Sequence, residues 1–172
     1  MKRLLFALSL IVVGGSLQSC SNQVYAKHPV SYRFESSKTA LIRNGIAYAP
    51  RNAPAAVKKA IAAGNRLQGK PYKWGGGHAN HHDNGYDCSG TTSYVLREAG
   101  LLRGCLTSKD YFKYGKKGEG DWITLYIRNG HVFMTVAGLR LDTGGGSNST
   151  GPQWKTATRG AKGHAMRHPN GL

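Results

Sequence analysis

The sequence predicts a single α+β domain, in which a helix carrying a cysteine packs against an antiparallel sheet. Two helical patterns come first along the chain, at residues 54–67 and 87–100. Three short apolar runs follow, at 122–127, 131–137 and 139–143, with turn-forming glycines between them. Helices followed by a meander of strands are typical of the α+β class, and a length of 172 residues suits one hydrophobic core.

Residues 1–20 have the pattern of an export signal. Lys2 and Arg3 form a charged start, and the apolar run 4–13 is too short to span a bilayer. Leu17-Gln18-Ser19-Cys20 resembles the lipobox of bacterial lipoproteins, in which Cys20 would carry the lipid.

A second processing site in this signal competes with the lipobox. Val24-Tyr25-Ala26 fits ordinary signal-peptidase cleavage before Lys27. The lipobox lies closer to the end of the apolar run, so we expect lipidation at Cys20. Either route takes the protein out of the cytosol, and the only membrane association that we expect is through the lipid.

The chain is strongly basic, with 24 Lys and Arg against 8 Asp and Glu and a formal net charge of +16. A charge of this size predicts an anionic partner. The basic residues are scattered and form no basic helix, arm or aromatic-plus-basic sheet pattern, which argues against nucleic acid. Together with the export signal, the charge favours anionic cell-envelope polymers.

The domain itself is expected to occupy residues 51–172. Residues 21–50 are polar without sustained periodicity, which predicts a tether followed by an N-terminal arm. The helix at 54–67 is expected to serve packing alone, and Gly69 ends it. After a linker rich in Lys and Gly at 113–120 comes the strand meander, and the segment 164–168 is expected to be a closing strand.

A glycine-rich loop precedes the cysteine helix, with the sequence Tyr72-Lys73-Trp74-Gly75-Gly76-Gly77-His78. Its glycines allow another backbone or a ligand to approach closely. The loop could simply place Tyr72 and Trp74 as caps on the core. Because Cys88 follows so soon, we favour a wall of a substrate cleft.

His78, His81, His82 and Cys88 together could suggest a zinc site. Structural zinc takes four nitrogen or sulfur ligands, usually in two pairs at short spacings. The chain has no such pair of pairs, and His81 and His82 are expected to point apart as neighbours in an extended segment. We therefore expect solvent-exposed loop histidines and no metal.

Cys88 lies in the stretch Tyr86-Asp87-Cys88-Ser89-Gly90, where the second helix begins. Asp87 is a good N-cap, and the free N–H groups and dipole of the helix start favour a thiolate. A thiolate is the form of cysteine that attacks a carbonyl carbon. The backbone N–H of Cys88 and the Tyr72 hydroxyl could stabilise the resulting oxyanion, with Trp74 and Ser89 beside the substrate.

The three cysteines, Cys20, Cys88 and Cys105, do not form a disulfide framework. A bridge between Cys88 and Cys105 is possible in an oxidising compartment and would block a nucleophile. We expect Cys105 instead to be a small buried residue beside the end of the helix.

His131 is the best candidate for the base that takes the thiol proton. It opens an apolar run directly after the hairpin signal Asn129-Gly130. A catalytic imidazole usually needs a third group to fix its tautomer. Asp142, on the next strand across the Gly138 turn, could accept the ring N–H, or it could be a strand-end aspartate that only shapes a turn.

Three motifs in order resemble those of the NlpC-type bacterial cell-wall cysteine peptidases: Tyr72-Lys73-Trp74-Gly75-Gly76, Asp87-Cys88-Ser89-Gly90 and Gly130-His131-Val132. The resemblance covers residues 54–172. It implies a papain-like α+β fold, no cofactor, and hydrolysis of peptidoglycan stem peptides, commonly at the γ-D-glutamyl–diamino-acid bond.

The resemblance also implies roles for single residues: nucleophile for Cys88, base for His131 and active-site tyrosine for Tyr72. The third catalytic position of the family is often His, Asn or Gln, so the carboxylate of Asp142 is a departure. Two other functions stay open, a CHAP-like N-acetylmuramoyl-L-alanine amidase and a non-catalytic wall-binding lipoprotein.

Overall fold

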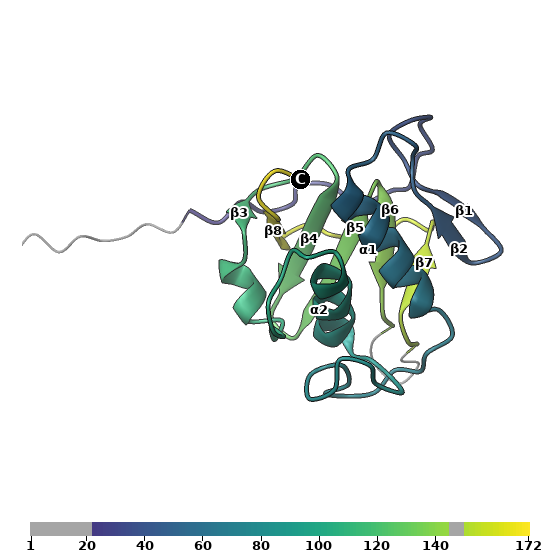
Figure 1. Ribbon diagram of the computed structural model, residues 1–172. Helices are drawn as coiled ribbons and strands as arrows, with labels where there is room; N and C mark the ends of the chain where they lie inside the picture. The colour runs from purple at the N-terminus through teal and green to yellow at the C-terminus, as the bar shows by residue number, and fades with distance from the viewer. Residues whose placement is uncertain (1–21, 145–149) are drawn as a thin grey trace, which may run out of the picture.

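The computed structural model describes residues 22–144 and 150–172, so the export signal and Cys20 lie outside the described residues. Two helices and a 3₁₀ turn accompany a two-stranded hairpin and a six-stranded sheet (Figure 1). The elements are β1 (Leu41–Arg43), β2 (Ile46–Tyr48), α1 (Ala55–Arg66), α2 (Cys88–Glu98), the turn η1 (Asp110–Lys113), β3 (Lys116–Lys117), β4 (Ile123–Arg128), β5 (His131–Val136), β6 (Leu139–Asp142), β7 (Gln153–Lys155) and β8 (Ala165–His168).

The six-stranded sheet has the order β3-β8-β4-β5-β6-β7, with every neighbouring pair antiparallel. The predicted meander is its centre, and the predicted closing strand is β8. Asn129-Gly130 joins β4 to β5, and the turn into β6 has positive φ at both Ala137 (45°) and Gly138 (70°). Positive φ at both central residues marks a turn whose twist matches that of the strands it joins.

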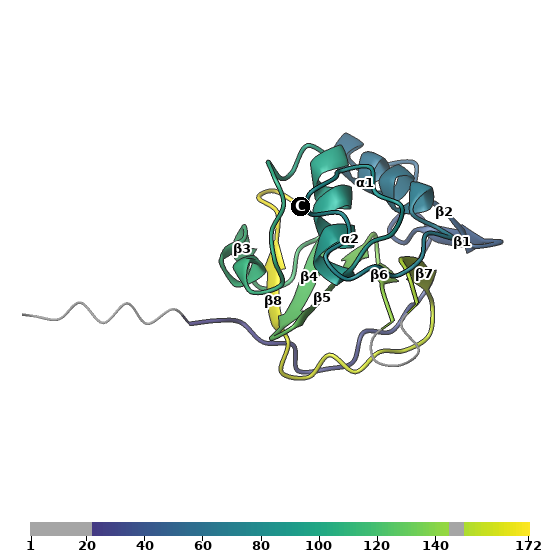
Figure 2. The same ribbon diagram turned by 90° about the horizontal axis from the view of Figure 1, so that it is seen from below.

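The sheet separates two layers of apolar side chains. Ile123, Leu125 and Ile127 of β4 face the main core, against which α1 and α2 pack. Tyr126 alternates to the other face, where it stacks on Phe133 at 4.8 Å between ring centres. Figure 2 shows the helices on one side of the sheet and two extended segments, from the two ends of the chain, on the other.

Residues 22–50 lie along the domain and are hydrogen-bonded to it. Ala26 donates its N–H to the carbonyl of His164 at 2.8 Å, and Met166 donates to Val24 at 2.8 Å. Further along, Asn65 of α1 exchanges two hydrogen bonds with the backbone of Ala47 in β2. The hairpin β1–β2 therefore packs on the helical side, where the sequence showed no periodicity.

The strands that sequence reasoning missed are two or three residues long, as in β1, β2, β3 and β7. A strand of this length shows no alternation that could be read from the chain. Two of these short strands, β3 and β7, are the edges of the six-stranded sheet. Each forms by pairing with a longer neighbour, β3 with β8 and β7 with β6. Within the described residues, no helix is long and apolar enough to cross a membrane.

Candidate active site

The start of α2 is built around Asp87. Its Oδ1 accepts a hydrogen bond from the N–H of Gly90 at 2.7 Å, the N-cap contact predicted from the sequence. Its Oδ2 accepts from the N–H of Gly75 at 3.0 Å, so the same carboxylate holds the glycine-rich loop. Cys88 is the first residue of the helix and only 9% exposed. The cap thus fixes the cysteine at the electropositive end of the helix.

The glycine-rich loop lies directly against the first turn of α2. A Cβ built at Gly90 would overlap the carbonyl oxygen of Gly76, and one built at Gly77 would meet the ring of Tyr86 at 2.5 Å. Gly76 also accepts a hydrogen bond from the N–H of Asp87 at 3.3 Å. The glycines therefore permit a close contact between loop and helix, as expected for a cleft wall.

Replacing Gly90 by alanine tests this contact. Glycine to alanine inside a helix ordinarily stabilises a protein by about 0.5–1 kcal/mol. Here the added methyl group has no room, so we expect a loss of about 1–3 kcal/mol in the free energy of unfolding, measured by urea titration. Gly160→Ala is the matched control, because nothing lies within 4 Å of its Cβ and its φ lies outside the left-handed region that disfavours alanine. A Gly90→Ala protein as stable as wild type would refute the close contact.

His131 is the first residue of β5, and its ring is held by Asp142 on β6. The Nε2–H of His131 donates to Oδ1 of Asp142 at 3.0 Å, with the two side chains 12% and 0% exposed. Arg140 donates a hydrogen bond to the other oxygen, Oδ2, at 2.6 Å, and Arg159 forms an ion pair with the same oxygen at 3.2 Å. Asp142 is therefore a buried carboxylate shared by a histidine and two arginines, and more than a residue that shapes a turn.

Two opposing influences act on the pKa of His131. Burial is the largest and lowers the pKa, but hydrogen bonds and charge interactions with Asp142 and Cys88 together outweigh it and raise the pKa above its ordinary value. Because Nε2 donates to Asp142, Nδ1 is the ring nitrogen left for the Cys88 thiol. The structure thus brings together the three residues that the sequence predicted to interact.

A cavity of about 250 Å³ opens beside Cys88. It is lined by Tyr72 and Trp74 from the glycine-rich loop, by Ser89 of α2, and by Thr107 and Ser108 from the loop after α2. The pKa of Tyr72 is raised by burial and by the charges of Cys88 and Asp87, which places its hydroxyl in the field of the thiol. Trp74 is 86% exposed at the rim, so it does not cap the core.

A larger cavity, of about 410 Å³, lies elsewhere. It is bounded by the arm residues 24–31 and by Tyr126, Thr135 and Met166 on the outer face of the sheet. None of its lining residues is a cysteine, and its one carboxylate, Glu119, has no acidic partner in the lining. The smaller cavity is lined by Cys88 and by Gly130, the residue before His131, so it is the one suited to catalysis.

The comparison with protein families agrees with this geometry. A model of the NlpC/P60 family matches residues 69–162, more than half of the chain. The protein belongs to the NlpC/P60 family. The family consists of cell-wall cysteine peptidases and related hydrolases, so the resemblance found in the sequence is confirmed. The predicted papain-like α+β arrangement is also observed, since α2 packs on β5 of the antiparallel sheet.

Among solved structures, the chain is similar to a mutated form of the resuscitation promoting factor interacting protein RipA. Identity is 22% and the TM-score is 0.45, over 69% of this chain and 66% of that one. The chain therefore spans just under two thirds of the length of that structure. No curated protein matches the chain.

Cys105 is not the buried residue that the sequence suggested. It is partly exposed and carries a free thiol, as Cys88 does, and its Sγ lies 3.4 Å from Nδ1 of His78. Nε2 of His78 in turn contacts Oγ of Ser89 at 3.0 Å and Oδ1 of Asp87 at 3.2 Å. Cys105 thus lies near the start of α2 and not beside its end, because the long loop after the helix returns to the NlpC/P60 cleft.

His81 and His82 do not point apart as expected. Their ring centres are 4.6 Å apart, because the segment is bent where the prediction assumed extended backbone. Of these two, His82 is exposed as predicted, whereas His81 is partly buried against Tyr94. Sequence reasoning also missed His78, which lines the cavity beside Ser89. A histidine on a glycine-rich loop belongs to no periodic pattern, so its position in the cavity lining can be seen only in the folded structure.

Proposed function

We propose that this NlpC/P60 protein is a peptidoglycan hydrolase that cleaves stem peptides with Cys88 as nucleophile and His131 as base. The observation that carries the proposal is the pairing of a cysteine at a helix start with a histidine held by a buried carboxylate. This is the geometry of nucleophile, base and orienting group that covalent acyl transfer requires. Family membership supports peptidoglycan as the substrate.

The reaction begins with the Cys88 thiolate paired with a protonated His131. The sulfur attacks the scissile carbonyl carbon to form a C–S bond, and collapse of the tetrahedral intermediate breaks the C–N bond as His131 protonates the leaving amine. Water, deprotonated by His131, then hydrolyses the thioester and releases the acid. Asp142 holds the imidazole in the tautomer that directs Nδ1 at the sulfur.

The oxyanion of the intermediate forms beside the first turn of α2. The first N–H groups of a helix have no partner within the helix, so the N–H of Cys88 is available to it. The Tyr72 hydroxyl, which lines the same cavity, is our candidate for the second donor. Trp74 at the rim and Ser89 at the floor are proposed to contact the stem peptide.

The pH profile of kcat/KM should show the effect of Asp142 on His131. Above the pKa of His131 the imidazolium that protonates the leaving amine is lost, so activity falls. Since that pKa is raised, we expect the alkaline fall above the ordinary histidine value of about 6.5. Asp142→Asn removes the negative charge and leaves Arg140 and Arg159 in place, so its alkaline fall should move to lower pH. An unchanged alkaline limb in Asp142→Asn would mean that Asp142 does not raise the pKa of His131.

The bond proposed for cleavage is the one between D-glutamate and the diamino acid. Purified muropeptides are incubated with wild-type protein and their products identified by mass. Fragments split after D-glutamate support the proposal. Cleavage between the muramoyl group and L-alanine would instead make the protein an amidase, and intact muropeptides retained by the protein would make it a wall-binding lipoprotein.

We further propose that the protein is exported and anchored by lipid at Cys20. The support is the leader sequence, together with a net charge of +16 for the whole chain, of which +14 remains without Lys2 and Arg3 of the leader and would hold the enzyme near anionic envelope polymers. Salt should weaken that electrostatic association. The lipid anchor would be refuted if Cys20→Ala protein stays in the membrane fraction at high salt.

A further inference from the structure

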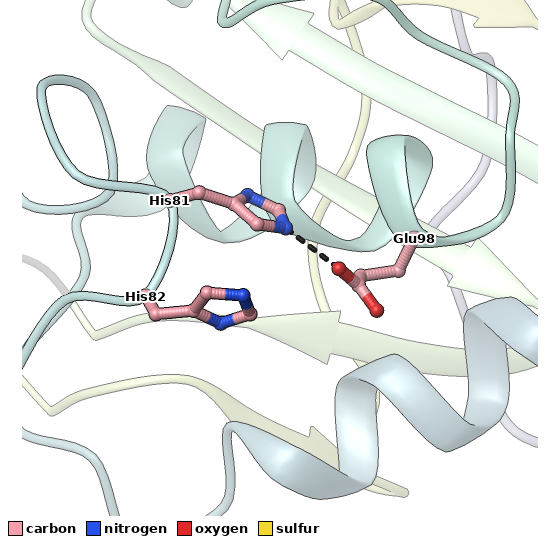
Figure 3. Close-up of side chains that lie close together, drawn as sticks. All are labelled: His81, His82 and Glu98. Atoms are coloured by element: carbon pink, nitrogen blue, oxygen red, sulfur yellow. Dashed lines mark hydrogen bonds and ion pairs between the residues drawn. The ribbon is translucent and has the colours of Figure 1, made fainter.

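A second cluster of chemically capable side chains lies outside the active site, at the other end of α2. His81 and His82 come from the loop before the helix, and Glu98 is the last residue of α2. One ligand atom from each lies within 4.8 Å of the others, and Figure 3 shows the two rings beside the carboxylate. We propose that these three residues bind a divalent transition metal, and that zinc is the metal they suit best.

The two rings are already positioned by neighbouring aromatic side chains. The His81 ring stacks on Tyr94 at 4.7 Å between ring centres, and the His82 ring meets the same tyrosine edge-on at 5.9 Å. The carbonyl of His81 accepts a hydrogen bond from the Tyr86 hydroxyl at 2.8 Å. Tyr94 and Glu98 are four residues apart on α2, so one face of the helix carries both the tyrosine on which the His81 ring stacks and the third metal ligand.

Glu98 divides its two oxygens between two neighbours. Oε1 lies 2.6 Å from Nε2 of His81, and Oε2 is held by the guanidinium of Arg66. A metal placed between His81 and Oε1 would replace that hydrogen bond while Arg66 continues to orient the carboxylate. Metal-bound carboxylates commonly have such a hydrogen-bond partner.

The separations suit a tetrahedral ion after small side-chain shifts. Zinc–nitrogen and zinc–oxygen bonds of about 2.0–2.1 Å place tetrahedral ligand atoms roughly 3.3 Å apart. His81 and Glu98 need to separate by less than about 1 Å, and the exposed His82 ring has room to shift toward them from its edge-on contact with Tyr94. Two histidines and a glutamate leave a fourth position for water, a ligand set known for zinc.

The chemistry of the cluster also excludes the commoner biological cations. Imidazole nitrogen suits zinc, copper and nickel, whereas magnesium and calcium need oxygen ligands. The positive charge of Arg66 beside Glu98 opposes cations that bind by charge alone. The sequence argument against zinc considered only His78, His81, His82 and Cys88, and it could not include a ligand from the far end of the helix.

A metal here would link the active-site loop to α2. The loop segment 78–86 runs from the cavity-lining His78 to the residue before Asp87, and it is already held by the contacts of His78 with the start of α2 and by the ion pair of Lys73 with Asp83 at 2.8 Å. The metal would strengthen the link at the far end of the helix, where a hydrogen bond between His81 and Glu98 is the present contact. The inference does not depend on the proposed peptidase reaction.

The test measures metal binding without an activity assay. Full-length protein carrying Cys88→Ser and Cys105→Ser, so that no cleft thiol competes, is stripped with chelator and titrated with zinc chloride in a calorimeter. The same titration is run on this protein with His82→Ala, with Glu98→Gln, and with His28→Ala as the control at an exposed histidine outside the cluster. Circular dichroism of each metal-free variant checks that it is folded.

We expect one zinc per chain in the parent and in His28→Ala. Loss of outer-shell partners weakens metal sites about 10–100-fold, so loss of a ligand in His82→Ala or Glu98→Gln should weaken binding by about 100-fold or more. Cobalt in the parent should show visible absorption typical of four-coordinate nitrogen and oxygen ligation. Absence of binding, or equal affinity in the folded His82→Ala protein, would overturn the proposal.

Discussion

Replacing Cys88 by alanine should abolish muropeptide hydrolysis and leave the fold intact. Removal of the nucleophile leaves only binding and oxyanion stabilisation, so we expect the rate to fall on the order of 10⁴-fold or more. The change removes one sulfur atom from the edge of a cavity, where alanine fits without strain. Rates are measured by mass spectrometry on purified muropeptides.

Cys105→Ala is the matched control for this loss. Cys105 is the other free cysteine among the described residues, and it contacts His78 but not His131. We expect it to keep most of the activity of the wild type. Equal loss in the two variants would mean that a general effect of thiol removal, and not the nucleophile, accounts for the result.

The second large effect should appear in stability, at Asp142. Its fully buried carboxylate neutralises Arg140, whose side chain is only 7% exposed, and also contacts Arg159 and His131. Asp142→Ala leaves these cations without their counter-charge, and breaking a buried ion pair by removing one partner costs about 3–5 kcal/mol. We expect a loss of that size in the free energy of unfolding, measured by urea titration.

Asp121→Ala removes a carboxylate from an exposed position and serves as the control, with stability expected close to wild type. Asp142→Asn removes the negative charge but keeps the shape of the side chain, and its amide oxygen can still accept a hydrogen bond from one neighbour. Its loss should be smaller than that of Asp142→Ala. If all three variants unfold at the same urea concentration, Asp142 does not organise this region.

The sequence was sufficient for the parts of the site that depend on local pattern. An aspartate one residue before an apolar helical run predicts an N-cap, and the structure has Asp87 in that place with Cys88 following it. The Asn129-Gly130 turn and the alternating strands after it placed His131 and Asp142 on adjacent strands, and the two side chains meet. Local signals of this kind are strong because turn and cap chemistry is short-range.

The features that were missed all depend on contacts between distant segments. Arg159 reaches Asp142 from the segment that follows β7 in the chain, and Glu98 joins His81 across the whole length of α2. Cys105 reaches His78 only because the loop after the helix turns back. No periodicity encodes such pairs, since tertiary packing alone decides which loop residues meet.

The central claim is that His131 activates Cys88, and the alkylation rates of the two cysteines test it most directly. Wild-type protein is treated with limiting iodoacetamide, and modification at each cysteine is followed by peptide mass. Exposure alone would make the partly exposed Cys105 react before Cys88, which is only 9% exposed. The account predicts the reverse order, with Cys88 slowed in His131→Ala to the rate of an ordinary thiol. Faster modification of Cys105, or a Cys88 rate unchanged by His131→Ala, would contradict it.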